Sequence, residues 1–306
     1  MTTAPPHAED GGVSPQGSAV QLLGPKEIRE LAEKLDVSPT KKLGQNFLHD
    51  PNTVRMIIAA AEITAADDVI EIGPGLGSLT LGLLEVARSV TVVEIDPRLA
   101  GELPATAAAR AGAAASTLSV HNRNALEFQR SDCAVAPTVL AANLPYNVSV
   151  PVLMHILAEF PSLRRVLVMV QKEVADRLAA APGSKIYGVP SVKAAYYGQV
   201  RRAGLVGKNV FWPAPKIDSG LVRIDCYERE NMPWQASAAE VFPIVDAAFA
   251  QRRKTLRAAL SGYFGSGERS AAILSRAGVD PTLRGERLGV REFVDIALAA
   301  REEAAE

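Results

Sequence analysis

The stretch Val69-Ile70-Glu71-Ile72-Gly73-Pro74-Gly75-Leu76-Gly77 decides the fold. An apolar, β-branched run changes there into three glycines at alternate positions, and helix-like sequence follows. We therefore predict a strand, a tight turn and the N-terminus of a helix. A Cβ atom at the glycines would block the close approach of a ligand to a backbone that can also adopt positive φ. The turn predicts a pocket for a nucleotide.

The spacing of the glycines distinguishes between nucleotide cofactors. A dinucleotide fingerprint that began at Gly73 would have its third glycine at position 78, which is Ser78, and no Gly-Lys-Ser/Thr of a phosphate loop follows. The next predicted strand carries Glu94 seventeen positions after Gly77, and a carboxylate there can accept hydrogen bonds from both hydroxyls of a ribose. This combination favours S-adenosylmethionine (SAM) over NAD. An NAD site and a purely structural turn stay open as alternatives.

Strand-like and helix-like segments alternate around this turn, a pattern that is typical of a doubly wound parallel sheet with helices on both faces. The predicted strands are Val69–Ile72, Val90–Ile95, Thr117–Val120, Thr138–Ala142 and Arg165–Val170. The predicted helices between them are Leu76–Ala87, Pro97–Ala114 and Val150–Phe160. Ligands of such sheets bind beyond the carboxyl ends of the strands. We expect the site at that edge.

The segments on either side complete the predicted architecture. Before the sheet, Asp50 is expected to cap a helix that begins at Pro51, and the loop 41–50 before it is either an ordinary connection or a flap over the cofactor. If it is a flap, the Asn46 side chain and the Leu48 backbone are the groups expected to touch the cofactor. After the sheet, we predict a helix at 172–181 and two strands, Ser191–Tyr197 and Leu221–Cys226, around a proline-stiffened loop.

Composition and charge restrict the class of protein and its domains. The chain has 306 residues, 48% of them hydrophobic and 22% charged, and its apolar runs are too short to span a bilayer. We expect a cytoplasmic protein with a disordered tail at 1–20, an α/β domain at 21–230 and a small helical domain at 231–306. Cys133 and Cys226 lie far apart without metal-ligand spacing, so we expect buried thiols and no metal site.

Net charge is only −1, yet basic residues gather locally. Residues 161–230 hold twelve Lys or Arg against six Asp or Glu, and residues 252–254 with Arg257 form a second cluster without acids. Local patches set the field that a nucleic acid meets. Each cluster is either an RNA contact or an ordinary solvated face.

Asn143-Leu144-Pro145-Tyr146 follows the strand Thr138–Ala142 and carries the predicted chemistry. The exocyclic amine of adenine or cytosine is a poor nucleophile, because its lone pair is delocalised into the ring. The Asn143 side-chain oxygen and the Leu144 carbonyl can hold the amine so that its lone pair faces a methyl group, while Tyr146 stacks on the base. A turn whose Asn serves geometry and whose Tyr belongs to the core is the alternative.

A base inside folded RNA must leave its stack to reach such a pocket, and aromatic side chains can receive it. Phe211, in the proline-rich loop, is the candidate for a second stacking face, and a core position is its alternative. No general base is required, because the proton can leave to water after transfer. Of the four histidines, His49, His121 and His155 have no partner at catalytic or metal-ligand spacing.

Taken together, the motifs resemble those of the rRNA adenine N6,N6-dimethyltransferases, in particular the bacterial small-subunit (16S) branch. The matching stretches span roughly residues 40 to 225: Gly44–Leu48, Glu71–Gly77, Glu94–Asp96, Asn143–Tyr146, Gln171–Glu173 and Phe211–Ser219. The resemblance implies that residues 21–230 form a SAM-dependent methyltransferase domain with a Rossmann-like sheet and that residues 231–306 form a helical, RNA-binding domain. It also implies the transfer of four methyl groups to two adjacent adenosines near the 3′ end of 16S rRNA, late in small-subunit assembly, by a monomer.

The resemblance also implies a set of cofactor-binding residues: Asn46, Leu48, Gly73, Gly75, Glu94, Asn124 and Asn143. Asn124 is a departure, because the family usually has an Asp there that binds the adenine amine of SAM. Its amide oxygen can still accept a hydrogen bond, without the charge-assisted part. Trp212 is a second departure, at a position that is usually proline.

Three other functions compete with this one. A large-subunit rRNA methylase lies within the same family, and the small-subunit branch is favoured by Gly44–Leu48 and the proline-rich loop. A ribosome-assembly factor without catalysis is opposed by the intact Asn143–Tyr146 motif. An NAD-dependent oxidoreductase is opposed by Ser78 and by the lack of a hydride-transfer constellation.

Overall fold

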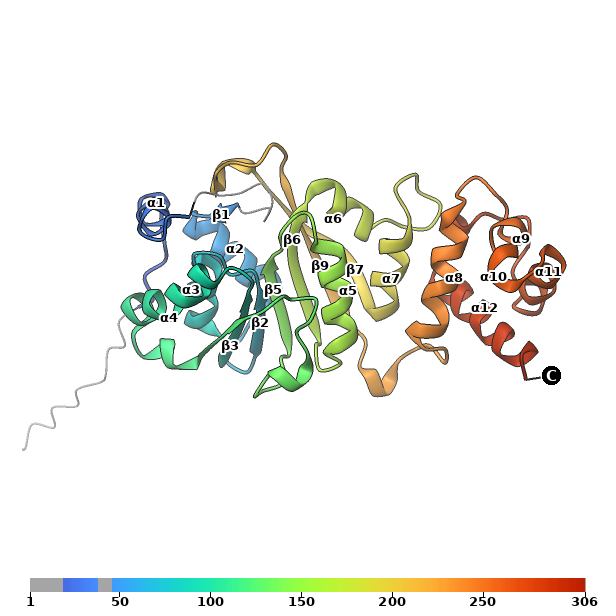
Figure 1. Cartoon of the computed structure of the whole chain (residues 1–306), viewed down its shortest axis with the longest axis horizontal. Helices are drawn as coiled ribbons and strands as arrows, with labels where there is room; N and C mark the ends of the chain where they lie inside the picture. Colours follow the sequence, from blue (N-terminus) through green and yellow to red (C-terminus); the bar gives the residue numbers. More distant parts are fainter. Residues whose placement is uncertain (1–18, 38–45, 306) are drawn as a thin grey trace, which may run out of the picture.

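The computed structural model describes residues 19–37 and 46–305. The tail expected at 1–20 therefore lies almost wholly outside the described residues, as do Gly44 and Gln45 of the first matching motif. Figure 1 shows a central sheet with helices on both sides, and the C-terminal helices at one end of the molecule. Within the described ranges, no helix is long and apolar enough to cross a bilayer.

The main sheet has seven strands in the order β4-β3-β2-β5-β6-β9-β7. From β4 to β6 all neighbours are parallel, whereas β9 runs antiparallel to both β6 and β7. Its strands are β2 (Asp68–Ile72), β3 (Ser89–Glu94), β4 (Leu118–Asn122), β5 (Val139–Asn143), β6 (Arg165–Gln171), β7 (Gly198–Val206) and β9 (Ser219–Cys226). A separate pair joins β1 (Phe47–Leu48) to β8 (Phe211–Trp212). The predicted α/β class is confirmed, with an antiparallel edge added to the parallel sheet.

Alternate side chains of the central strands enter two different cores, as the period of a strand requires. On β6, Val166 and Val168 belong to one hydrophobic cluster, and Leu167 and Met169 belong to the other. Helices α1 to α4 supply the second cluster, and α5 to α12 supply the first. Their bounds are α1 Pro25–Lys34, α2 Pro51–Ala61, α3 Ser78–Val86, α4 Pro97–Ala111, α5 Ser149–Glu159, α6 Lys172–Leu178, α7 Val189–Tyr197, α8 Ala238–Ala250, α9 Leu256–Ala259, α10 Ser261–Phe264, α11 Gly267–Arg276 and α12 Val290–Glu303.

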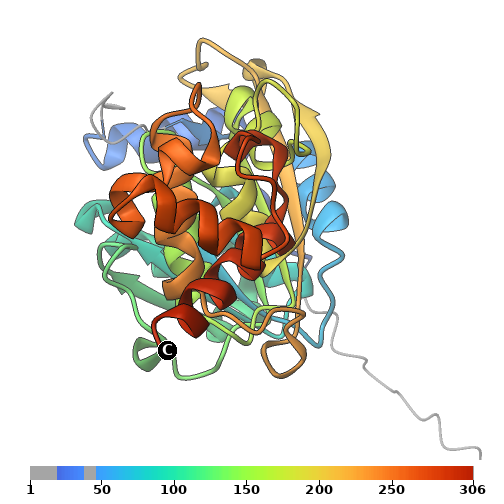
Figure 2. The ribbon, with the colours of Figure 1, turned by 90° about the vertical axis from the view of Figure 1, so that its right-hand side faces the viewer.

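The C-terminal helices α8 to α12 share their core with one face of the sheet. Phe293 of α12 and Val245 of α8 lie in the same cluster as Ile70 and Leu140 of the central strands. Figure 2, which turns that end toward the viewer, shows these helices gathered in front of the rest of the molecule. The helical region is therefore packed against the α/β layers and not tethered by a linker alone.

One predicted strand was wrong. Ser191–Tyr197 lies in the helix α7, and the edge strand β7 follows it. The β-branched and aromatic residues of the segment favour a strand, but the preceding residues start a helix. Pro190 occupies the first turn, and Ser191 Oγ accepts a hydrogen bond from the amide at the N-cap, 3.1 Å away.

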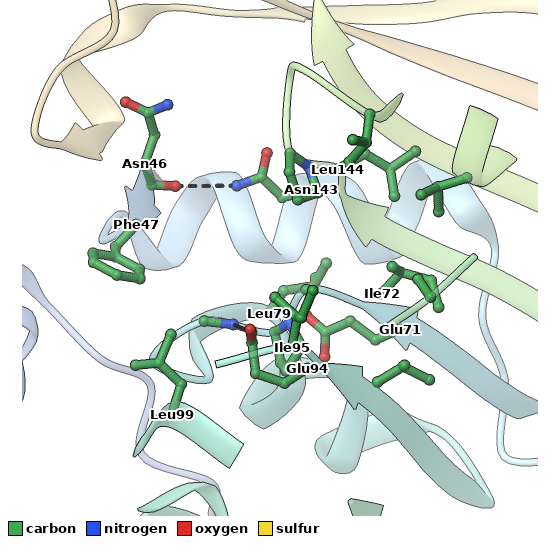
Figure 3. Close-up of a pocket in the computed structure, with 18 of the residues that line it drawn as sticks. Asn46, Phe47, Glu71, Ile72, Leu79, Glu94, Ile95, Leu99, Asn143 and Leu144 are labelled. Carbon is green, nitrogen blue, oxygen red and sulfur yellow. Dashed lines mark hydrogen bonds between the residues drawn. The ribbon is translucent and has the colours of Figure 1, made fainter. Parts of the chain in front are cut away.

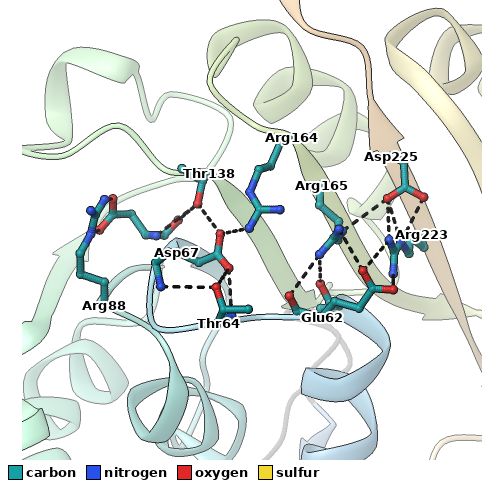
Figure 4. Close-up of polar contacts among 12 residues, drawn as sticks. Glu62, Thr64, Asp67, Arg88, Thr138, Arg164, Arg165, Arg223 and Asp225 are labelled. Atoms are coloured by element: carbon teal, nitrogen blue, oxygen red, sulfur yellow. Dashed lines mark hydrogen bonds and ion pairs between the residues drawn. The ribbon is translucent and has the colours of Figure 1, made fainter.

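Both ends of α2 are fixed by side chains. Asp50 accepts a hydrogen bond from the Thr53 amide at 2.8 Å, which confirms the predicted cap. At the other end, Arg165 of β6 donates to the Ala61 carbonyl at 2.9 Å, and Arg223 of β9 forms an ion pair with Glu62 at 2.7 Å (Figure 4). Guanidinium groups are favourable beside the carbonyls of a helix C-terminus. The C-terminal end of α2, the helix that follows residues 46–48, is thus held by side chains of β6 and β9.

Candidate active site

The glycine turn between β2 and α3 adopts the backbone that its sequence requires. Gly73, Gly75 and Gly77 have φ values of 70°, 59° and 92°, in the left-handed region that side chains disfavour. A Cβ atom on Gly75 would lie 3.0 Å from the Phe47 ring, and one on Gly77 would lie 2.6 Å from Leu103. The predicted tight turn with positive φ is confirmed, and the approach of a ligand to its backbone stays a prediction.

Residues 46–48 lie over this turn, because β1 pairs with β8 and Ser78 anchors it from below. Ser78 Oγ donates a 2.5 Å hydrogen bond to the Leu48 carbonyl. Ser78 is the residue that replaces the third glycine of a dinucleotide fingerprint, so the departure has a structural role that sequence reasoning missed. The only sequence signal for this contact was a hydroxyl side chain at the first position of a helix, together with a separate polar loop that could receive its hydrogen bond.

Two buried carboxyl groups lie beneath the turn. Glu94, at the end of β3, accepts hydrogen bonds from the amides of Gly75 at 3.1 Å and Asp96 at 2.9 Å. Glu71 of β2 is 1% exposed and accepts a 2.6 Å hydrogen bond from Thr80. Burial raises the pKa of both groups, and the pKa of Glu71 reaches about 8, since the Glu94 charge adds to the burial.

Two exposed apolar side chains, Ile95 and Leu126, and the Asn124 amide line the same cavity as Glu94. Ile95 is 55% exposed and Leu126 is 40% exposed, and both line the same cavity. Side chains of this kind suit the faces of a planar ring. Asn124 lines the same cavity, but its oxygen already accepts from the Leu126 amide at 3.1 Å, and its nitrogen donates to Glu127 at 3.2 Å. Sequence reasoning missed Ile95 and Leu126, although both adjoin residues that it named.

Asn143 ends β5 at the opposite side of the cavity. Its side-chain nitrogen donates to the backbone carbonyl of Asn46 at 3.3 Å, and the Asn46 side chain points away from it (Figure 3). A carbonyl oxygen can only accept, so the Asn143 side-chain atom that faces Asn46 is the amide nitrogen. The Asn143 amide oxygen then points in another direction. Leu144 follows, with its side chain buried and its amide bonded to Met169, so only its carbonyl is available to a ligand.

Tyr146 and Phe211, the two predicted stacking residues, lie in different surroundings. Tyr146 lines the cavity, and its hydroxyl lies 2.7 Å from Ser219 Oγ. Phe211 is 2% exposed and packs in the hydrophobic cluster of α1 to α4, outside the cavity lining. The stacking role predicted for Phe211 is therefore not supported, because its pairing with Leu48 places the ring in the core.

The site residues predicted from the sequence, except Phe211, line one cavity of about 220 Å³. It lies beyond the carboxyl ends of β2, β3 and β5, as expected for a sheet of this topology (Figure 3). The sequence-predicted residues in its lining are Asn46, Leu48, Gly73, Gly75, Glu94, Asn124, Asn143, Leu144 and Tyr146. Their roles in binding and catalysis stay predictions.

Two solved structures share the architecture of this chain. A crystal structure of a dimethyladenosine transferase from Plasmodium falciparum matches with a TM-score of 0.72 and 24% identity, over 84% of this chain and 98% of that one. A crystal structure of the 23S rRNA methyltransferase ErmE matches with a TM-score of 0.61 and 24% identity, over 83% of this chain and 99% of that one. At this identity the likeness shows the fold.

Sequence relatives extend the likeness to the whole length. The ribosomal RNA small subunit methyltransferase A of Corynebacterium diphtheriae is 64% identical over 94% of this chain and 99% of its own length. That of Nocardia farcinica is 57% identical over 95% of this chain and 99% of its own length. The model of the ribosomal RNA adenine dimethylase family matches residues 38–301. The chain therefore belongs to the ribosomal RNA adenine dimethylase family.

Proposed function

We propose that this chain dimethylates two adjacent adenosines near the 3′ end of 16S rRNA, within a nearly complete small ribosomal particle. Membership of the family makes the chain a SAM-dependent rRNA adenine dimethyltransferase. The names of its bacterial relatives support the small subunit as the target. We further propose that it acts in the cytoplasm as a monomer. The observation that carries the proposal is the orientation of the Asn143 amide.

The cavity fits SAM on three counts. Gly73 and Gly75 present backbone without side chains to the cavity, Glu94 offers a carboxylate at the end of β3, and Ile95 with Leu126 offers apolar surface for a purine. We propose that Glu94 binds the ribose hydroxyls and that Asn124 lies at the edge of the adenine. When bound, SAM supplies a methyl group on a positively charged sulfur.

The Asn143 amide is oriented to accept a hydrogen bond from the target amine. Its nitrogen is held by the Asn46 carbonyl, and among the described residues no hydrogen bond is made to its oxygen. We propose that this oxygen and the Leu144 carbonyl hold the two hydrogens of the adenine amine, so that the lone pair faces the methyl group. The proton then leaves to water.

The C-terminal helices are proposed to contact the rRNA backbone through the loop after α8. The Arg252 guanidinium donates to the carbonyls of Lys185 and Tyr187, at 3.2 Å each, so it has an internal role. Arg253 and Lys254 are exposed. Replacing both with glutamine is expected to reduce the salt dependence of particle binding by about two ions, because each phosphate contact releases roughly one counterion.

Incorporation of labelled methyl groups from SAM into small ribosomal particles that lack the modification tests the proposal. Nucleoside analysis of the digested rRNA is expected to give two adjacent N6,N6-dimethyladenosines. Asn143→Ala is the control, because it should keep the fold, as circular dichroism would show, and transfer nothing. Methylation of large-subunit rRNA would favour the large-subunit alternative, and particle binding without transfer by the wild type would favour an assembly factor.

A further inference from the structure

The contact between Tyr146 and Ser219 joins two motifs that the chemistry above does not connect. Tyr146 lies three residues after Asn143, on the turn that follows β5, and its ring lines the cavity. Its hydroxyl is 2.7 Å from Ser219 Oγ, and either oxygen can be the donor. Burial raises the pKa of Tyr146, so the phenol keeps its proton at neutral pH and can donate.

Ser219 is a fixed point in the sheet. It is the first residue of β9 and is paired on both sides, with Gln171 of β6 and with Val206 of β7. Its exposure to solvent is 0%, so no bulk water reaches the hydroxyl. Among the described residues, the hydrogen-bond partner of that hydroxyl is Tyr146. A buried hydroxyl that lost this partner would be left unsatisfied.

We propose that Ser219 is a positioning residue, which holds the Tyr146 ring in the plane that receives the target base beside Asn143. The inference rests on the proposed function. The phenol oxygen lies on the long axis of the ring, so the hydrogen bond fixes the direction of that axis. Rotation about the axis is restricted as well when the phenol donates, because its hydrogen prefers the plane of the ring. Because Tyr146 and Asn143 share one short turn, a fixed ring also fixes the base relative to the Asn143 oxygen.

A double-mutant cycle tests the inference. Tyr146→Phe keeps the ring and removes the bond from one side, Ser219→Ala removes it from the other, and the double variant removes both. Each single variant is expected to lower kcat about fivefold, the effect of one net hydrogen bond, and the double variant is expected to be no slower than the slower single variant. The SAM affinity from calorimetry should stay within about twofold of the wild type, because the Tyr146 ring is not among the groups proposed to contact SAM.

The matched control is Ser191→Ala. Ser191 is 1% exposed and donates a 2.5 Å hydrogen bond to the Arg177 carbonyl, away from the cavity. This variant should lower the melting temperature and leave kcat unchanged. If Ser219→Ala does not fold, Tyr146→Phe alone decides, since it deletes the same bond from the more exposed partner.

Two results would overturn the role of Ser219: a wild-type kcat in Tyr146→Phe, or losses that multiply in the double variant. An inactive wild type would instead refute the proposed function, so the two failures are distinguishable. Loss of SAM binding in either single variant would also overturn the inference, because the effect would then be a general disturbance of the pocket.

Discussion

Glu71→Gln is expected to make the protein more stable at mildly alkaline pH. Glu71 is 1% exposed, and its pKa lies at about 8 against an ordinary 4.5. Between these two values the folded protein keeps a proton that the unfolded chain has lost. The free energy of unfolding therefore falls as pH rises through this window, because deprotonation is easier in the unfolded state.

The magnitude follows from linkage. One extra proton in the folded state lowers the free energy of unfolding by about 1.4 kcal/mol for each pH unit within the window. The pKa values of 4.5 and about 8 bound the total effect at roughly 5 kcal/mol. Glutamine has nearly the same shape, can accept the Thr80 hydrogen bond and carries no charge at any pH, so this contribution to the slope should vanish.

Urea denaturation at a series of pH values between about 5 and 8, without SAM, measures the effect. The wild type should lose stability relative to Glu71→Gln steadily across the series. Glu85→Gln, on the exposed side of α3, is the control and should follow the wild type. Parallel curves for the wild type and Glu71→Gln would refute the argument, since Glu71 would then titrate alike in both states.

Three further substitutions test other parts of the structure. Gly75→Ala should lower the free energy of unfolding by about 1–2 kcal/mol and weaken SAM binding in calorimetry, because residue 75 needs a left-handed φ. Gly101→Ala in α4 has open space around it and should be neutral or stabilising. Arg223→Met removes the ion pair at the end of α2 and should lower the free energy of unfolding by about 1–3 kcal/mol. Lys26→Met, at an exposed ion pair, should change it little. Equal effects of the two variants in urea denaturation would contradict the anchoring of α2. Asn124→Asp should bind SAM about fivefold tighter, through a charge-assisted hydrogen bond to the adenine amine, and an unchanged calorimetric affinity would count against that contact.

Local signals made most of the sheet predictable. The three glycines force one turn, and the strands β2 and β6 are apolar runs with clear boundaries. Asp50 with Pro51 fixes the start of α2, because both residues favour the first turn of a helix. These elements are set by neighbours in the chain, which a sequence displays directly.

The missed features depend on residues that are distant in the chain. β7 carries a glycine-interrupted, Arg-containing sequence with a bulge between Arg202 and Gly204, so it lacks the alternation of a half-buried strand. Its position follows from pairing with β9. In the same way, Phe211 belongs to the core because β8 pairs with β1, and Ser78 finds its partner thirty residues earlier, at Leu48. No local pattern encodes these contacts.

The pairing of β1 with β8 has a consequence for the synthesis of the protein. Leu48 and Phe211 are partners, so a growing chain must gain roughly 160 residues after β1 before the cover of the glycine turn can form. At ordinary rates of translation that interval lasts about 8 to 30 s. During this time the nascent chain has the turn between β2 and α3 without the strand pair that closes it. Residues 46–48 line the cavity, so its complete wall can form only after translation has passed β8.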